Sequence, residues 1–151
     1  MKHLFFGIVL CLISTLVFTQ NKTVEWLSAQ ELEQRYYQAP KPILIFLETD
    51  WCKICKMQIN TTFKNDSIVE QLNEFYYSFK LNAEHKDSIR FFKRTYQYNN
   101  VEKLNQLAIY LGEKNIRIEF PITVILDQKL QPIFRKASLV SSEELMKLIA
   151  Q

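Results

Sequence analysis

The stretch ILIFLETDWCKICK, residues 43–56, joins an apolar run to two cysteines that are separated by two residues. Residues 43–48 are almost continuously apolar, which predicts a central strand covered on both faces. A helix-compatible run over residues 52–63 follows. A thiol where a strand meets a helix N-terminus lies beside free N–H groups and the positive end of the peptide dipoles, which favour the reactive thiolate. The stretch therefore predicts thiol chemistry at Cys52 and Cys55.

The composition is that of a folded domain. A chain of 151 residues suits one domain with a hydrophobic core. Hydrophobic residues make up 48% of the chain, with 11 Phe, 7 Tyr and 2 Trp, which excludes an intrinsically disordered chain. The formal net charge of +3 is too small to indicate a nucleic-acid partner.

The N-terminus forms a segment distinct from the rest. Lys2 and His3 precede an uncharged apolar run over residues 4–18, which is shorter than the ~20 residues that a membrane span needs. A basic start, a short apolar middle and a polar exit are typical of a cleaved secretory signal. We predict a signal peptide over residues 1–20 and a mature domain over residues 21–151. An uncleaved signal is the alternative, and it is the only membrane attachment that we expect.

Export would change the meaning of the cysteine pair. Removal of residues 1–20 leaves Cys52 and Cys55 as the only cysteines of the chain. In an oxidising compartment such a pair forms either a structural or a working disulfide. A ring closed across two residues constrains the unfolded chain least, so this pair is a poor structural staple. We predict that Cys52, nearer the helix start, attacks a partner's sulfur and that Cys55 resolves the mixed disulfide.

The order of the predicted elements indicates an α/β fold. Helices are expected at residues 26–37, 52–63, 66–75, 84–98, 101–111 and 141–150, and strands at residues 43–48, 75–81, 122–126 and 131–136. Capping boxes at Ser28–Glu31 and Ser141–Glu144 support the first and last helices. A strand–helix–strand start and a terminal hairpin predict a mixed central sheet of about four strands with helices on both faces.

Three motifs in this order resemble the thioredoxin superfamily. Residues 51–56, WCKICK, resemble its active site after an apolar strand, and residues 80–82, KLN, resemble the end of its third strand. Phe120-Pro121 falls where the family keeps a cis-proline. Residues 50–52 and 62–63 resemble the C-terminal domain of the exported electron carrier DsbD and related periplasmic proteins. The resemblance covers roughly residues 24–150 and implies a thioredoxin-like fold in the bacterial periplasm.

The resemblance also implies roles for residues around the cysteines. The cis bond before Pro121 would pack against the disulfide, and the backbone of Phe120 would pair with a substrate chain in a short β-like contact. Trp51 is expected to flank the reactive sulfur and to contact the substrate, with ordinary packing as the alternative. These three residues are therefore predicted to bind the substrate.

The sequence departs from thioredoxin at one position beside the cysteines. Thioredoxin carries a buried aspartate six residues before its first cysteine, where this chain has Phe46. Glu48 lies two residues further on and shares a strand face with Phe46. Glu48 and Lys80 are candidates for proton transfer or for electrostatic support of the thiols. A plain carboxylate at the strand end is the simpler interpretation of Glu48.

A second departure lies between the third strand and the cis-proline. Residues 83–119 are longer than the corresponding segment of thioredoxin and are expected to form a helical insertion with two helices. Lys86, Arg90 and Arg94 would then form one basic stripe at a spacing of four residues. The stripe predicts either a partner-binding surface or an ordinary solvated helix face.

These features together predict an exported thiol–disulfide oxidoreductase that needs no cofactor and reduces partner proteins through Cys52 and Cys55. Cysteine-containing proteins are the expected substrates, and an upstream thiol would supply the electrons. A disulfide oxidase or isomerase is one alternative. A copper(I)-handling or partner-docking module is another, with His85 as a possible third ligand. No closed zinc site is expected, because such a site needs four ligands.

Overall fold

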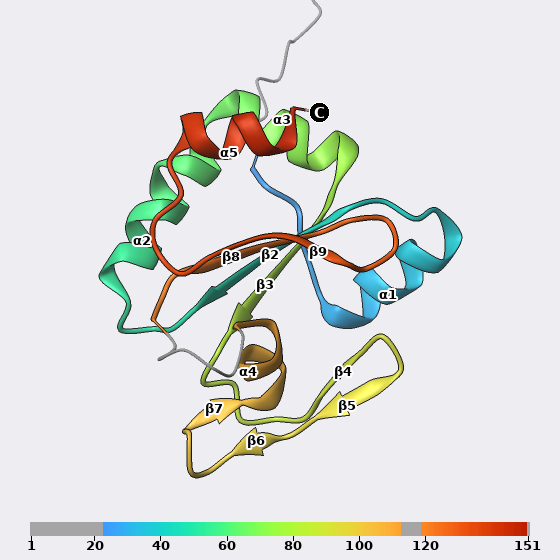
Figure 1. Cartoon of the computed structure of the whole chain (residues 1–151), viewed down its shortest axis with the longest axis vertical. Helices are drawn as coiled ribbons and strands as arrows, with labels where there is room; N and C mark the ends of the chain where they lie inside the picture. Colours follow the sequence, from blue (N-terminus) through green and yellow to red (C-terminus); the bar gives the residue numbers. More distant parts are fainter. Residues whose placement is uncertain (1–22, 113–118, 151) are drawn as a thin grey trace, which may run out of the picture.

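The computed structural model describes residues 23–112 and 119–150, so the predicted signal peptide over residues 1–20 lies outside the described residues. A mixed sheet in the order β1-β3-β2-β8-β9 forms the centre of the molecule (Figure 1). Its strands are β1 Trp26–Leu27, β3 Tyr77–Asn82, β2 Ile43–Glu48, β8 Ile122–Leu126 and β9 Pro132–Lys136. Strand β2 pairs parallel to β3 and antiparallel to β8. The predicted mixed sheet is confirmed.

The sheet has one strand more than the sequence indicated. Trp26 and Leu27 pair with β3 as the short edge strand β1, and helix α1 begins only at Ala29, over Ala29–Gln38. The predicted helix start at residue 26 is therefore wrong. The capping box is confirmed, because Ser28 and Glu31 each accept a hydrogen bond from the other's backbone N–H. A strand of two residues is too short to show an alternating pattern, and its apolar residues resembled the first turn of a helix.

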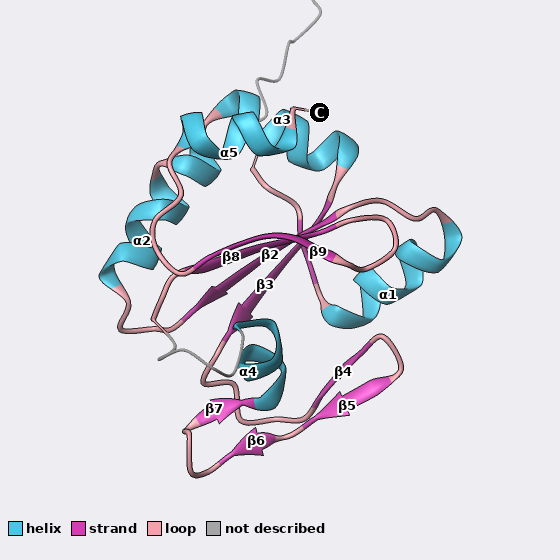
Figure 2. Cartoon of the chain, viewed as in Figure 1, coloured by secondary structure: helices cyan, strands magenta, loops and turns pink. Residues whose placement is uncertain are grey.

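Helices cover both faces of the sheet, as expected. Helices α2 Lys53–Asn60, α3 Asp66–Phe75 and α5 Ser142–Ile149 lie on one face, and the 3-10 turn η1 Thr62–Lys64 joins α2 to α3. Helix α1 lies on the other face with α4 Gln106–Gly112 (Figures 1 and 2). The cysteine pair thus stands on the face that three helices cover.

Strand β2 divides its side chains between two hydrophobic cores. Ile43, Ile45 and Leu47 belong to the core beneath α1 and α4, whereas Leu44 and Phe46 belong to the core beneath α2, α3 and α5. All five side chains have no exposed surface. Successive side chains of a strand point to opposite faces, so a continuous apolar run is what a strand buried on both faces requires.

The expected helical insertion over residues 83–119 is wrong for most of its length. The segment instead forms two small hairpins before helix α4 (Figure 2). Strand β4 Ile89–Phe91 pairs with β5 Arg94–Tyr96, and β6 Tyr98–Asn99 pairs with β7 Leu104–Asn105. Residues 113–118 lie outside the described residues.

Tertiary packing explains why this segment forms hairpins where helices were predicted. Phe91 and Tyr96 are buried in the same core as α1 and α4, and they reach it from paired strands. Aromatic and β-branched residues favour strands once a surface is available for them to pack against. The predicted basic stripe does not form, because Arg90 and Arg94 lie on opposite strands of the hairpin.

An aromatic cluster behind the cysteines offers a test of this fold. Phe63 is 3% exposed, and its ring centroid lies 5.0 Å from those of Trp26 and Phe46. We expect Phe63→Ala to lower the free energy of unfolding by about 3–5 kcal/mol, because it removes buried apolar surface and leaves a cavity. Urea unfolding followed by circular dichroism measures the loss. Phe75→Ala is the control, since Phe75 is 49% exposed, and equal losses in the two variants would contradict the cluster.

Candidate active site

The cysteine pair lies where β2 gives way to α2, as the sequence predicted. Cys52 is the N-cap residue of α2, its N–H donates to the Thr49 carbonyl at 3.1 Å, and its sulfur accepts from the Cys55 N–H at 3.0 Å. The two cysteines form a disulfide, with their Cα atoms 5.2 Å apart. In the reduced state the same N–H group and the helix dipole would favour a thiolate on Cys52.

The two cysteines are both buried and differ slightly in exposure. Cys55 has no exposed surface, whereas Cys52 keeps 4%. Trp51, Ile54 and Met57 are exposed apolar side chains on and beside the same turn. The small exposed surface of the cysteine pair therefore belongs to Cys52, and exposed apolar side chains lie beside it.

Trp51 is held from two sides by residues distant in the sequence. Its indole Nε1 donates to Glu84 Oε1 at 3.0 Å, and its ring lies edge-on to that of Phe120 at 6.3 Å between centroids. Phe120 precedes Pro121, which is buried, and the peptide bond between them is cis. Pro121 comes one residue before the Ile122–Leu47 pair of β8 and β2. The structure thus brings Trp51 and Phe120 together. It places Pro121 at the same end of the central strands as the disulfide.

Asn82 connects this turn to the start of residues 83–119. Its side-chain Nδ2 donates to Asp50 Oδ1 at 3.0 Å, and its Oδ1 accepts from the Glu84 N–H at 2.9 Å. The sequence indicated Asn82 only as part of the KLN motif, and it did not indicate the contact of Glu84 with Trp51. No local pattern signals Glu84, because its partner Trp51 is 33 residues away.

Glu48 and Lys80 form an ion pair, with 3.2 Å between Lys80 Nζ and Glu48 Oε1. Lys80 lies opposite Phe46 in the parallel pairing of β2 and β3, so all three side chains share the face that α2 covers. The Glu48 side chain is 18% exposed and the Lys80 side chain 36%. Glu48 and Lys80, which the sequence indicated as two separate candidates, are thus in direct contact.

Phe46 occupies the site of the missing acid with an aromatic ring. It is fully buried in the core that contains both cysteines. A neutral polar pair, missed by sequence reasoning, is buried nearby. Gln58 Nε2 donates to Thr123 Oγ1 at 3.1 Å, and Gln58 Oε1 accepts from the Val140 N–H at 3.0 Å. Thr123 pairs with Phe46 across β8 and β2, so uncharged groups occupy this part of the core.

Within residues 23–112 and 119–150, no three His, Cys, Asp or Glu side chains are grouped so that they could hold a metal ion. His85 lies 3.8 Å from Asp87 Oδ2 in a pairing that needs a protonated imidazole. None of the helices described is long and apolar enough to cross a membrane.

The strand order, the CxxC disulfide at the start of α2 and the proline before β8 define a thioredoxin fold. Solved structures support this class. A thioredoxin from Thermus thermophilus superposes with a TM-score of 0.61 at 11% identity, over 85% of this chain and 86% of that one. A DsbH oxidoreductase superposes with a TM-score of 0.58 at 16% identity, over 85% of this chain and 83% of that one.

The oxidised C-terminal domain of DsbD from Neisseria meningitidis is also similar. Its TM-score is 0.55 at 12% identity, over 84% of this chain and 98% of that domain. No family profile and no curated protein sequence matches this chain. At identities this low, the structural superpositions establish the fold alone. The disulfide within that fold supports thiol–disulfide redox chemistry.

The contact between Trp51 and Glu84 is open to a direct test. We expect Glu84→Ala to free the indole and to lower the fluorescence anisotropy of Trp51, measured in a Trp26→Phe background so that one tryptophan emits. The stability loss should stay below about 1.5 kcal/mol, because the contact is partly exposed. Glu84→Gln keeps a carbonyl acceptor and should retain the anisotropy. Unchanged anisotropy in Glu84→Ala, with the exposed Glu102→Ala as control, would contradict the contact.

Proposed function

We propose that this protein is an exported thiol–disulfide oxidoreductase that reduces disulfides in partner proteins. The observation that carries the proposal is the Cys52–Cys55 disulfide at the N-terminus of α2. A dithiol in this position can close and open without a cofactor, because the oxidised form is the disulfide itself. Electrons for the next cycle come from an upstream thiol.

The proposed order of attack follows from the positions of the two cysteines, with Cys52 at the N-cap of α2 and Cys55 within the helix. The Cys52 thiolate attacks one sulfur of a partner's disulfide, a mixed disulfide forms, and the other partner sulfur leaves as a thiolate that takes up a proton. Cys55 then attacks Cys52 Sγ as a thiolate, and the second partner thiol is released. The partner gains two electrons and two protons, and the protein is left with the Cys52–Cys55 disulfide. Cys55 resolves the intermediate because it is buried and lies one helical turn away.

Three residues are proposed to bind the partner chain. Trp51 is 66% exposed and forms an apolar wall beside Cys52. The backbone of Phe120, before the cis bond to Pro121, is proposed to pair with the partner chain in a short β-like contact. These residues lie at the end of the sheet where the partner's sulfur must approach.

Residue 46 is Phe, so no buried carboxylate at this position can transfer protons to and from Cys55. The Glu48–Lys80 ion pair lies on the same face of the sheet as Phe46. We propose that this ion pair supports the thiols electrostatically and exchanges protons with the solvent at the C-terminal end of β2.

The redox cycle is tested by titration in glutathione buffers followed by alkylation and mass spectrometry. We expect Cys52 and Cys55 to interconvert reversibly between dithiol and disulfide. A reduction potential near about −270 mV supports the reducing direction, and one near about −120 mV supports an oxidase instead. The resemblance of residues 50–52 to the C-terminal domain of DsbD favours the first outcome. A pair that never closes reversibly would overturn the proposed function.

Matched cysteine variants test the order of attack. Cys55→Ser should accumulate a mixed disulfide between Cys52 and a model partner, because the resolving thiol is lost. Cys52→Ser should accumulate none, because Cys55 is buried. Equal trapping by the two variants would contradict the assigned roles.

Export is proposed from the N-terminal sequence, with the bacterial periplasm as the compartment. Expressed in a Gram-negative host from residue 1, the protein should appear in the periplasmic fraction with a mass that lacks about twenty N-terminal residues. Substitution of the apolar run by Leu10→Arg and Val9→Arg should abolish cleavage and export. A full-length chain in the cytoplasmic fraction would contradict the proposed export.

A further inference from the structure

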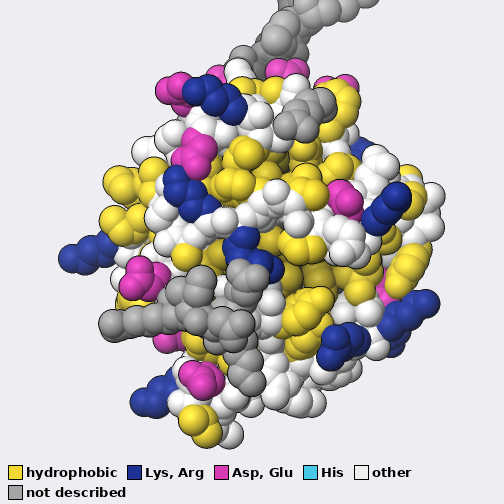
Figure 3. Space-filling view, viewed as in Figure 1, with side chains coloured by type: hydrophobic (Ala, Val, Ile, Leu, Met, Phe, Trp, Pro, Cys, Tyr) yellow, Lys and Arg dark blue, Asp and Glu magenta, His cyan; other side chains and the backbone are white. Residues whose placement is uncertain are grey.

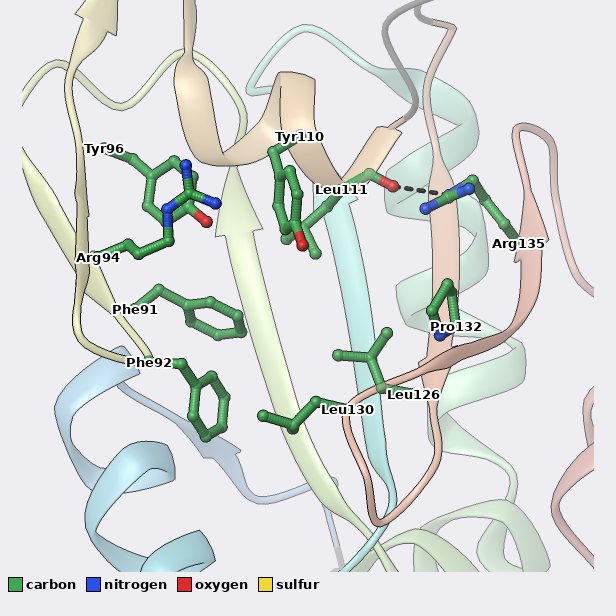
Figure 4. Close-up of a pocket in the computed structure, with 10 residues that line it drawn as sticks. All are labelled: Phe91, Phe92, Arg94, Tyr96, Tyr110, Leu111, Leu126, Leu130, Pro132 and Arg135. Carbon is green, nitrogen blue, oxygen red and sulfur yellow. Dashed lines mark hydrogen bonds between the residues drawn. The ribbon is translucent and has the colours of Figure 1, made fainter.

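A cavity lies on the face of the sheet opposite α2, between the β4–β5 hairpin, α4 and the β8–β9 hairpin (Figure 4). Its volume is about 450 Å³, within the range of sites that hold small molecules. Its lining residues are Phe91, Phe92, Arg94, Tyr96, Tyr110, Leu111, Leu126, Leu130, Pro132 and Arg135. The redox site uses none of them.

Aromatic and aliphatic side chains form two facing walls of this cavity. Phe91 and Phe92 point from the β4–β5 side toward Leu126 and Leu130 on the β8–β9 side, and Tyr110 extends between the two walls from α4 (Figure 4). Tyr110 is 58% exposed, so one ring stands at the open side. Hydrophobic side chains also gather over the middle of this face of the molecule, beside Lys and Arg side chains (Figure 3). The lining of the cavity is thus mainly aromatic and aliphatic, as in sites for apolar small molecules.

Two guanidinium groups line the cavity, and Arg94 is the one on which the ligand argument rests. The Arg94 guanidinium lies over the rings of Tyr96 and Tyr110, at 5.6 and 5.9 Å from their centroids. Arg135 donates from Nε to the Leu111 carbonyl at 2.7 Å, a contact drawn in Figure 4. Burial raises the pKa of Tyr96, so its phenol stays neutral at physiological pH. No lining residue named for this cavity is acidic, and guanidinium groups held on aromatic rings are suited to bind a carboxylate.

Two turns beside the cavity have left-handed backbone. Phe92 and Leu130 have φ values of 44° and 61°, in the left-handed region that favours glycine or asparagine. Phe92 and Lys93 form the two-residue turn between β4 and β5, and both have positive φ, as a tight hairpin turn requires. Phe92 and Leu130 each carry a large apolar side chain that lines the cavity.

The cavity lies far from the disulfide within the fold. Leu126 pairs with Ile43 at the start of β2, whereas the cysteines follow the end of β2. The lining residues Phe91, Leu111 and Leu126 also belong to the core on the other face of the sheet from Cys52. A ligand here can bind in either redox state of the cysteine pair.

We propose that this cavity binds a small organic carboxylate with an aromatic body. The aromatic body lies between the Phe91–Phe92 wall and the Leu126–Leu130 wall, and the carboxylate lies at Arg94 near the open side. This assignment goes beyond the proposed redox function and does not depend on it.

The test uses 1-naphthoate as the probe and 1-naphthamide as its uncharged counterpart, in calorimetric titrations of the oxidised full-length protein. We expect naphthoate to bind with one-to-one stoichiometry and at least tenfold more tightly than naphthamide. Arg94→Gln should weaken naphthoate binding at least fivefold and leave naphthamide binding unchanged, and Arg94→Lys should lie between them. Arg90→Gln is the matched control, because Arg90 lies on the same hairpin but does not line this cavity, and it should change nothing.

Three outcomes would overturn the assignment. They are no naphthoate binding, equal affinity for the acid and the amide, and equal weakening by Arg94→Gln and Arg90→Gln. Circular dichroism of each variant checks the fold, and Arg94 and Arg90 are both exposed. The Cys52→Ser variant should bind naphthoate as the unchanged protein does, which separates this site from the redox function.

Discussion

The burial of β2 on both faces is the constraint on which the rest of this structure depends. Five successive side chains without exposed surface require a core on each side. One core is built by α2, α3 and α5, and the other by α1, α4 and the hairpin of β4 and β5. The end of the strand is thereby fixed in space, and the turn that follows places Cys52 at the N-terminus of α2.

Two kinds of contact position the groups around the disulfide. Local contacts hold the cysteines, through the Cys55 N–H that donates to the Cys52 sulfur. Long-range contacts hold their surroundings, where Glu84 binds the indole of Trp51 and Phe120 lies against its ring. The cysteines are therefore positioned by one turn of chain, whereas the exposed surroundings of Trp51 are assembled from three separate segments.

The replacement of a buried acid by Phe46 changes the character of the core below the cysteines. The ring packs with Trp26 and Phe63, and the buried polar groups nearby, Gln58 and Thr123, are uncharged and hydrogen-bonded to each other. A neutral core avoids the cost of an unpaired buried charge. The Glu48–Lys80 ion pair lies on the same face of the sheet as Phe46.

By itself the sequence determined what depends on neighbouring residues. The buried runs of β2 and β8, the capping box at Ser28 and the cysteines at the first turn of α2 follow from periodicity and spacing, and the structure confirms them. Only the tertiary structure decided the edge strand β1, the two hairpins predicted as helices and the pairs Trp51–Glu84 and Gln58–Thr123. The physical reason is that β1 and the two side-chain pairs join residues that are distant along the chain, 33 and 65 positions apart in the two pairs. The β4–β5 hairpin is local, but it depends on burial in a core that other segments build. Phe92 and Tyr96 are four residues apart and suit one face of a helix, but the core that buries Phe91 and Tyr96 selected the hairpin.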